Sequence, residues 1–250
     1  LVNAYDLLVV THDAQRMIAA RYGVTIPVAV VLPAFDVTEY PFVDRDFAGT
    51  LRFVHPSTAQ IRKGTPTLLR AFRTAFPKES DVTLTIHGAI CDLLTWWRDR
   101  LGDWDSDERI TFDETFYDPI EYVKQVYHGN HVVVEPILAQ GYGVGVWEAC
   151  ATGMPAIVSR VDSFAEHFST RYGWFVVTSN SEFARANLYP GTFGHYLMPD
   201  FASLVSALRS AYEHRDECAS KGFEAAKFVR STLTFDRAGA DVMRLIEGVL

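Results

Sequence analysis

Short apolar runs alternate with longer segments of helical period along most of this chain. Such alternation is typical of α/β units arranged around a parallel sheet. We therefore predict a doubly wound parallel sheet with helices on both faces and a ligand site at the carboxyl ends of its strands. The expected strands are Asp6–Thr11, Val28–Leu32, Leu51–His55, Val82–His87, Ile110–Phe112, His131–Pro136, Pro155–Ser159 and, last, Trp174–Val177. The expected helices are His12–Tyr22, Thr65–Phe76, Cys91–Leu101, a helix capped by Asp118 that runs through Tyr127, Gly143–Ala151, Phe201–Glu213, Asp216–Arg230 and Phe235–Leu250.

Two stretches lack any clean period. Phe35–Thr50 is rich in Asp, Pro and aromatic residues, and we interpret it as a linker that precedes a domain starting near Leu51. Ser181–Asp200 mixes aromatic residues with Pro and Gly, and we expect an inserted loop there. The chain opens at Leu1 and enters an apolar run almost at once, which suggests a cut through a longer protein.

Composition narrows the classes of function. A formal net charge of −8 gives no global basic field that would attract nucleic acid. The three cysteines, Cys91, Cys150 and Cys218, are widely spaced and odd in number, which argues against a disulfide framework and a cysteine-based zinc site. No apolar run approaches the roughly 20 residues of a membrane span. We expect a cytoplasmic protein.

The strongest chemical signal is a glycine-rich turn between a buried strand and a helix. Residues 135–155 read Glu-Pro-Ile-Leu-Ala-Gln-Gly-Tyr-Gly-Val-Gly-Val-Trp-Glu-Ala-Cys-Ala-Thr-Gly-Met-Pro. The first turn of a helix presents unpaired backbone N–H groups and the positive end of the helix dipole, which suits a phosphate. Glu148 follows one to two turns later, where a carboxylate can accept hydrogen bonds from ribose hydroxyls.

These residues resemble the retaining glycosyltransferases of the GT-B fold, the group 1 or family 4-like enzymes. Their motif is a Glu, a Gly-aromatic-Gly start, a second Glu followed by Ala, and a Gly-x-Pro turn into a strand. Gly141-Tyr142-Gly143, Glu148-Ala149 and Ala151–Pro155 match it position for position. The likeness extends over nearly the whole chain through Ser163–Glu166, Gly173–Val176, Arg62-Lys63-Gly64, Asp6–Thr11 and Leu32–Asp36.

The resemblance implies a Rossmann-like donor-binding domain over residues 51–250, with residues 1–50 forming the end of an N-terminal domain and the interdomain linker. It implies that Lys63, Gly143 and Val144 hold the donor diphosphate and that Glu148 binds the ribose. Gly88 and the segment Phe112–Phe116 would contact the base through their backbone. The other donor-binding residues that we expect are Thr58, Arg62, Gly141 and Tyr142.

Two positions depart from the family pattern. Gln140 stands where the family has its first motif Glu, so it keeps hydrogen-bonding capacity and loses the charge that stabilises a developing positive sugar. Thr58 stands where the family usually has an Arg, and Arg62 is the neighbouring cation that can take its place. We count Lys63, Gln140 and Glu148 as the candidate catalytic residues.

The implied function is transfer of a hexose from a nucleotide diphosphate sugar, with retention, to an unknown acceptor. The resemblance implies no metal or other cofactor, and an acceptor-binding N-terminal domain on the missing part of the chain or on another chain. One alternative is a weakened or inactive domain that binds nucleotide sugars or partners, which Gln140 and Thr58 favour. Another is a nucleotide-sugar epimerase of GT-B architecture, which would need acid and base groups from both domains.

Several other side chains have both structural and functional interpretations. We expect His87 to be structural, His131 to begin a strand at the surface, and His12 and His55 to lie near the cleft. Glu166 would contact sugar hydroxyls or cap the helix after it. Trp96 and Trp97 are expected to pack on a helix face.

Overall fold

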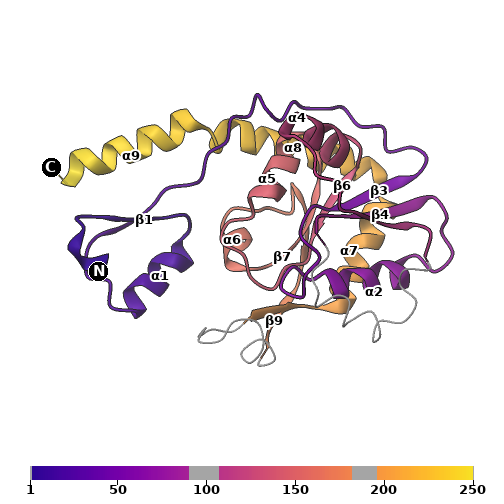
Figure 1. The fold of residues 1–250 in the computed structure, drawn as a ribbon, viewed down its shortest axis with the longest axis horizontal. Coiled ribbons are helices and arrows are strands. Elements are labelled where there is room, and N and C mark those ends of the chain that lie inside the picture. The colour runs from indigo at the N-terminus through magenta and orange to yellow at the C-terminus, as the bar shows by residue number, and fades with distance from the viewer. Residues whose placement is uncertain (1, 90–106, 182–195, 250) are drawn as a thin grey trace.

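A six-stranded parallel sheet forms the centre of the molecule, as the alternating pattern predicts (Figure 1). The computed structural model describes residues 2–89, 107–181 and 196–249, so the expected helix Cys91–Leu101 and its Trp96 and Trp97 lie outside the described residues. The strand order is β5-β4-β3-β6-β7-β8. The strands are β3 (Leu51–His55), β4 (Val82–His87), β5 (Ile110–Asp113), β6 (Val132–Glu135), β7 (Ala156–Ser159) and β8 (Gly173–Val176).

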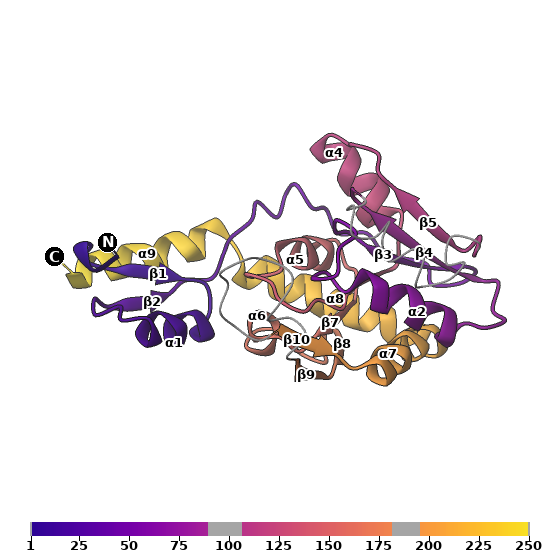
Figure 2. The same ribbon diagram turned by 60° about the horizontal axis from the view of Figure 1, so that its bottom comes forward.

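Helices cover both faces of this sheet (Figure 2). One face packs against α2 (Thr65–Ala75) and α7 (Phe201–Glu213), and the other against α5 (Val144–Ala151) and α8 (Arg215–Thr232). Because successive strand residues point to opposite faces, Phe53 joins the first core and Val54 the second. The sheet is thus buried on both sides, which accounts for the nearly continuous apolar runs of its strands.

The predicted N-cap at Asp118 is confirmed. Its carboxylate accepts hydrogen bonds from the backbone N–H groups of Ile120 and Glu121, both at 3.0 Å. The helix that follows has two parts, α4 (Pro119–Tyr122) and a π-helical segment, Val123–His128. This wider turn was not predicted, since residue periodicity does not distinguish it from an α-helix.

Residues 2–34 lie apart from the central sheet. They form a short 3-10 turn (Val2–Ala4), β1 (Leu8–Val10), α1 (Asp13–Arg21) and β2 (Val28–Val30), with β1 and β2 paired in parallel. Helix α9 (Phe235–Val249) leaves the core and lies beside them in both views (Figures 1 and 2). The chain passes between the two parts of the molecule twice, after residue 34 and before α9. These two connections are joined by a hydrogen bond from Phe35 N–H to the Leu233 carbonyl over 3.0 Å.

Residues 36–50 contain no helix or strand, as expected of a linker. Hydrogen bonds nevertheless hold this segment against the core. The buried Arg45 guanidinium donates to the backbone carbonyls of Tyr127, Asn130 and Thr152. The linker is therefore a fixed strap across one side of the domain.

Two predictions are wrong. Trp174–Val177 is not the last strand, because β9 (Thr178–Ser181) and β10 (Tyr196–Pro199) pair in antiparallel fashion at the two ends of the expected loop. Residues 182–195 between them are not described. A short helix, α6, spans Asp162–Ala165. His131 is not at the surface: its side chain is buried, and Nδ1 accepts from the Arg52 backbone N–H over 2.9 Å.

Candidate functional site

The strand order itself marks the crevice where a ligand is expected. From β3 the chain moves outward in one direction to β4 and β5, and then returns to place β6 on the other side of β3. The loops that leave the carboxyl ends of β3 and β6 diverge at such a switch point, and ligands of open α/β sheets bind there. All the predicted phosphate-binding side chains come from these two loops, residues 56–64 and 136–143.

The two loops are joined by backbone contacts. Leu138 N–H donates to the Arg62 carbonyl over 2.9 Å, and Arg62 Nη1 donates to the Ala139 carbonyl over 3.0 Å. Gly64 has a φ of +76°, and a Cβ atom there would lie 1.9 Å from the Pro136 carbonyl oxygen. Only glycine allows this approach. At least one N–H group of the Arg62 side chain is thus used in a hydrogen bond that holds the two loops together.

Lys63 and Gln140 meet across the same crevice. The ammonium Nζ of Lys63 donates to Oε1 of Gln140 over 3.0 Å. Because the amide carries no charge, Lys63 has a hydrogen-bond partner that does not neutralise it. A positive charge is therefore held at the mouth of the crevice beside the glycine-rich loop.

The N-terminus of α5 lies beside Gln140, because a Cβ atom at Gly143 would be 2.9 Å from Gln140 Nε2. Gly143 precedes the helix with a φ of +87°, and Val146 N–H already donates back to the Gly143 carbonyl over 3.0 Å. Within the described residues, the Val144 and Gly145 N–H groups have no hydrogen-bond acceptor. Two amide donors and the positive end of a helix dipole are therefore available near Lys63.

Glu148 lies just over one turn further along α5, and two tyrosines donate to it. Tyr40 Oη donates to Oε1 over 2.9 Å, and Tyr127 Oη donates to Oε2 over 2.8 Å. Burial, and then the Glu148 charge, raise the pKa of Tyr40. The pKa of Tyr127 is likewise raised well above its ordinary value, mainly by burial. Both phenols therefore stay protonated and remain donors.

Gly88 and Thr58 lie against each other at the neighbouring strand end. Gly88 has a φ of +135°, and a Cβ atom there would lie 3.0 Å from the Thr58 backbone nitrogen. Next to them, Asp113 accepts from His87 Nδ1 over 3.2 Å and from Tyr117 Oη over 3.1 Å. Burial raises the pKa of Asp113, but hydrogen bonds from Thr115, His87 and Tyr117 outweigh it and lower the pKa to about 2. His87 is buried and hydrogen-bonded, and its structural role stays a prediction.

Tyr142 is placed differently from the other motif residues. Its side chain is buried in the second core, with its ring near those of Trp147 and His167. A role in donor binding for Tyr142 therefore falls to its backbone.

A buried polar group beneath the crevice was not predicted. Glu135, only 3% exposed at the carboxyl end of β6, accepts a hydrogen bond from Ser57 Oγ, and its Oε2 has no partner among the described residues. His55 Nδ1 lies 3.8 Å from the same carboxylate, and burial lowers the His55 pKa. The sequence signal that could have indicated this group is an acidic residue at the end of an otherwise apolar strand.

Residues 12–14 touch the glycine-rich loop from the other part of the molecule. His12 Nε2 lies 3.0 Å from the Gly141 carbonyl oxygen. Glu166 accepts from the N–H groups of Asp13 and Ala14, at 2.8 and 3.0 Å. Glu166 therefore caps α1, about 150 residues earlier in the chain, and not a helix that follows it. The expected contact of Glu166 with sugar hydroxyls stays a prediction.

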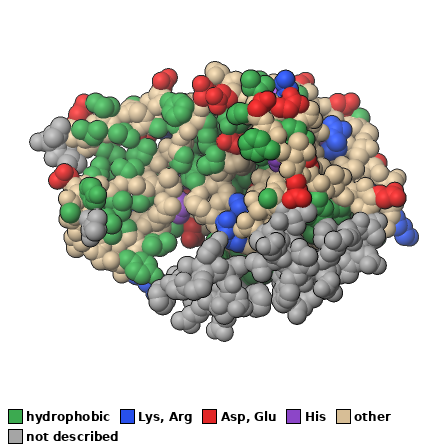
Figure 3. Space-filling model, in the orientation of Figure 1, with side chains coloured by type: hydrophobic (Ala, Val, Ile, Leu, Met, Phe, Trp, Pro, Cys, Tyr) green, Lys and Arg blue, Asp and Glu red, His purple; other side chains and the backbone are tan. Residues whose placement is uncertain are grey.

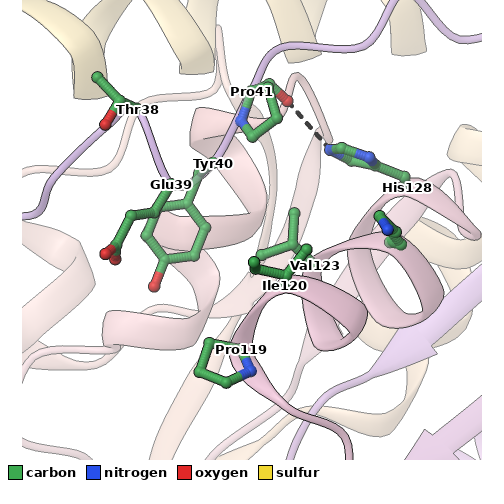
Figure 4. A pocket seen from close by; sticks show the side chains of 9 residues that line it. Thr38, Glu39, Tyr40, Pro41, Pro119, Ile120, Val123 and His128 are labelled. Carbon is green, nitrogen blue, oxygen red and sulfur yellow. Dashed lines mark hydrogen bonds between the residues drawn. The ribbon is translucent and has the colours of Figure 1, made fainter.

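A pocket of about 490 Å³ opens beside Tyr40 (Figure 4). Tyr40 reaches from the linker between Glu39 on one side and the pair Ile120 and Val123 on the other. The Tyr40 ring thus lines this pocket, while its hydroxyl contacts Glu148. The full lining is Thr38, Glu39, Tyr40, Pro41, Pro119, Ile120, Val123, Lys124 and His128.

Three features of the described residues concern metal ions, thiols and membrane spans. No group of three His, Cys, Asp or Glu side chains there is arranged to hold a metal ion. Cys150 and Cys218 are buried free thiols. In the same part of the chain, no helix combines the length and the apolar character of a bilayer span.

Comparison with known proteins places this site in a family. The model of the family "Glycosyl transferases group 1" matches residues 50–189, which is more than half of the chain. No curated protein matches the sequence.

Solved structures of similar fold include three proteins whose names or bound ligands refer to sugars. Sucrose-phosphate synthase from Thermosynechococcus elongatus has 15% identity and a TM-score of 0.74, and the match covers 99% of this chain and 59% of that one. Anabaena HepE, in complex with UDP and glucose, has 14% identity, a TM-score of 0.75 and coverages of 98% and 64%. The pneumococcal O-GlcNAc transferase GtfA, in complex with UDP and GlcNAc, has 14% identity, a TM-score of 0.70 and coverages of 99% and 46%. The chain therefore spans about half to two thirds of the length of these proteins.

Proposed function

The chain belongs to the glycosyl transferases group 1 family and has the GT-B fold, and from this premise we propose that it is the donor-binding part of a retaining hexosyltransferase. Its donor is a nucleotide diphosphate sugar. The observation that carries the proposal is the hydrogen bond of Lys63 to Gln140 beside the N-terminus of α5, at the switch point of the sheet and just over one turn before Glu148. The complexes of similar proteins with UDP support this choice of ligand class.

In the proposed reaction, the protein assists departure of the nucleoside diphosphate from the anomeric carbon. Lys63 and the amides of Val144 and Gly145 hold the phosphate oxygens, so negative charge that develops on the leaving group meets fixed donors. Gln140 binds a sugar hydroxyl through its amide, and Glu148 accepts from the ribose. Because Lys63 and the helix dipole supply the positive charge, the proposed site requires no metal, and the reaction class is group transfer without a cofactor.

The base is proposed to lie against Gly88 and the turn after β5. Thr58 offers its backbone and hydroxyl at this position, and Arg62 provides the second cation once its bond to Ala139 is exchanged for phosphate.

The free thiols at Cys150 and Cys218 support a reducing, cytoplasmic location.

The acceptor is proposed to bind to an N-terminal domain that packs against residues 2–34 and α9. In the orientation of Figure 3, hydrophobic side chains gather over this end of the molecule. The exposed apolar side chains of these elements include Met17 and Ile18 of α1, 65% and 51% exposed, and Met243 of α9, 55% exposed. Large exposed apolar patches of this kind mark interaction surfaces.

A second proposal is a domain that binds nucleotide sugars without efficient transfer. The observation that favours it is the pairing of Lys63 with the neutral Gln140, which leaves no carboxylate at that point of the crevice. Both proposals share the donor site and differ in turnover.

One experiment separates the two. The protein is incubated with UDP-, GDP- and ADP-hexoses, and nucleotide release and the anomeric configuration of the product are followed by NMR. Release with retained configuration, lost in Lys63→Met, supports the transferase. Binding without release supports the second proposal, and the absence of both contradicts the donor site.

A further inference from the structure

Three separate segments converge on the Glu148 carboxylate. Tyr40 comes from the linker, Tyr127 from the π-helical segment, and Glu148 itself from α5. One phenol donates to each carboxylate oxygen, at 2.9 and 2.8 Å. The two hydrogen bonds together fix the rotation of the carboxylate plane, because each oxygen is held from a different side chain.

The backbone around Tyr40 is itself held in place. Arg230 Nη2 donates to the Tyr40 carbonyl over 2.5 Å, and His128 Nε2 lies 3.1 Å from the Pro41 carbonyl. Further along, Val43 N–H donates to the Thr152 carbonyl, at the end of α5, over 3.0 Å. The Tyr40 hydroxyl is therefore delivered to Glu148 by a strap that is bonded to the core on both sides.

The hydrogen-bonding capacity of the carboxylate leaves room for a sugar. A carboxylate can accept about four hydrogen bonds, and the two tyrosines use two of them. One acceptor position remains on each oxygen, and a ribose presents two adjacent hydroxyl donors at its 2′ and 3′ carbons. Charge-assisted bonds of this kind discriminate strongly when the acceptor is fixed in advance.

We propose that Tyr40 is a specificity-determining residue of the nucleotide site: with Tyr127 it orients the Glu148 carboxylate so that the site selects a ribonucleotide over its 2′-deoxy counterpart. Tyr40 acts through Glu148 and is a positioning residue. This inference rests on the proposed function, since it requires a nucleotide beside Glu148. It assigns to the linker a role that the glycine-rich motif alone does not contain.

The test compares two affinities in each variant. Calorimetry gives the dissociation constants of UDP, GDP and ADP and of their 2′-deoxy forms for the wild type, and the best-bound pair is then used with Tyr40→Phe. Tyr212→Phe is the matched control, because it also removes a phenol that donates to a carboxylate, that of Asp81 over 2.6 Å. Circular dichroism confirms that each variant is folded.

We expect the wild type to favour the ribonucleotide and Tyr40→Phe to lower the ratio of the two affinities by about fivefold or more, since bonds to charged groups are among the stronger hydrogen bonds. Tyr212→Phe should leave the ratio unchanged. If Tyr40→Phe is folded and still binds nucleotide with an unchanged ratio, the proposed role of Tyr40 is overturned, while the proposed nucleotide site is not. If no nucleotide binds the wild type, the proposed function fails and the inference fails with it.

Discussion

The Lys63 ammonium donates to the side-chain oxygen of Gln140 over 3.0 Å, joining the loop after β3 to the loop after β6. A neutral partner leaves the full lysine charge available to a diphosphate, whereas a carboxylate in its place would form an ion pair. The same neutral partner stabilises positive charge on a departing sugar less well than a carboxylate. Residue 140 therefore sets a balance between binding the donor and cleaving it.

Gln140→Glu should shift that balance toward cleavage. We expect the rate of nucleotide release from the bound nucleotide sugar to rise about tenfold, which is less than the roughly hundredfold or more that one fully preorganised donor contributes in such sites. The affinity for the nucleoside diphosphate should fall by about threefold, because the new carboxylate competes for Lys63. Release kinetics and calorimetry measure the two quantities. Equal values for both proteins would contradict the role given to residue 140.

Thr58→Arg should strengthen nucleotide binding. Thr58 lies against Gly88 at the carboxyl end of β4, and its own side chain carries no charge. An added guanidinium there would reach the diphosphate, and we expect about a fivefold gain in affinity at low salt that shrinks as the salt concentration rises. Thr38→Arg, on the exposed linker, adds the same charge elsewhere and should change little. A gain of equal size in both variants would point to general electrostatic attraction.

Gly64→Ala should destabilise the fold. A Cβ atom at residue 64 would lie 1.9 Å from the Pro136 carbonyl oxygen, at a φ of +76°. The strained backbone alone costs about 1–3 kcal/mol, and the clash adds to it, so the free energy of unfolding should fall by more than about 2 kcal/mol. Urea denaturation measures it. Gly141→Ala is the control from the partner loop, since a Cβ there meets nothing within 4 Å.

Much of the central sheet was predictable because its physical signals are local. Strands buried on both faces require apolar runs, and β3 and β4 span the residues that were predicted, Leu51–His55 and Val82–His87. The Asp118 cap was equally readable, since a side-chain acceptor followed by Pro119 has few other interpretations. The β9-β10 pair was missed because its partners are separated by a long segment without period.

The neighbours of the site were less predictable than the motif. Glycines at 64, 141 and 143 and the acid at 148 follow from the pattern, and their roles in binding stay predictions. Tyr40 lies 108 residues from Glu148 in sequence, and nothing in the linker composition marks its hydroxyl. His12 and Glu166 meet across an even longer separation. Contacts of this kind depend on how segments pack, which periodicity does not encode.

The pH dependence of stability should contain a contribution from His131. Burial, and then the nearby Arg52 and Arg45 charges, lower the His131 pKa to about 4 in the folded state. In the unfolded chain its pKa is about 6.5, so the unfolded state binds more protons between these values. His131 therefore contributes stability that is present above pH 6.5 and is lost as the pH falls toward 4. We expect a loss on the order of 2 kcal/mol, at about 1.4 kcal/mol per pKa unit and with some screening.

His131→Asn isolates this contribution. The Asn side-chain oxygen can still accept from the Arg52 N–H, but it does not titrate in this range. Urea denaturation of both proteins at several pH values between 4 and 7 should give curves that differ in slope below pH 6.5 and run parallel above it. Parallel curves over the whole range would contradict the neutral, buried state of His131.

The measurement that tests the donor site most directly is calorimetry of nucleoside diphosphate binding to the wild type, Lys63→Met and Glu148→Gln. We predict that both substitutions weaken binding by about tenfold or more, because each removes a charge-assisted contact, to the diphosphate in one case and to the ribose in the other. Lys78→Met, on the exposed turn after α2, should bind as the wild type does. If the wild type binds a nucleoside diphosphate and both site variants bind it equally well, the nucleotide does not occupy the crevice between β3 and β6, and the proposed function is contradicted.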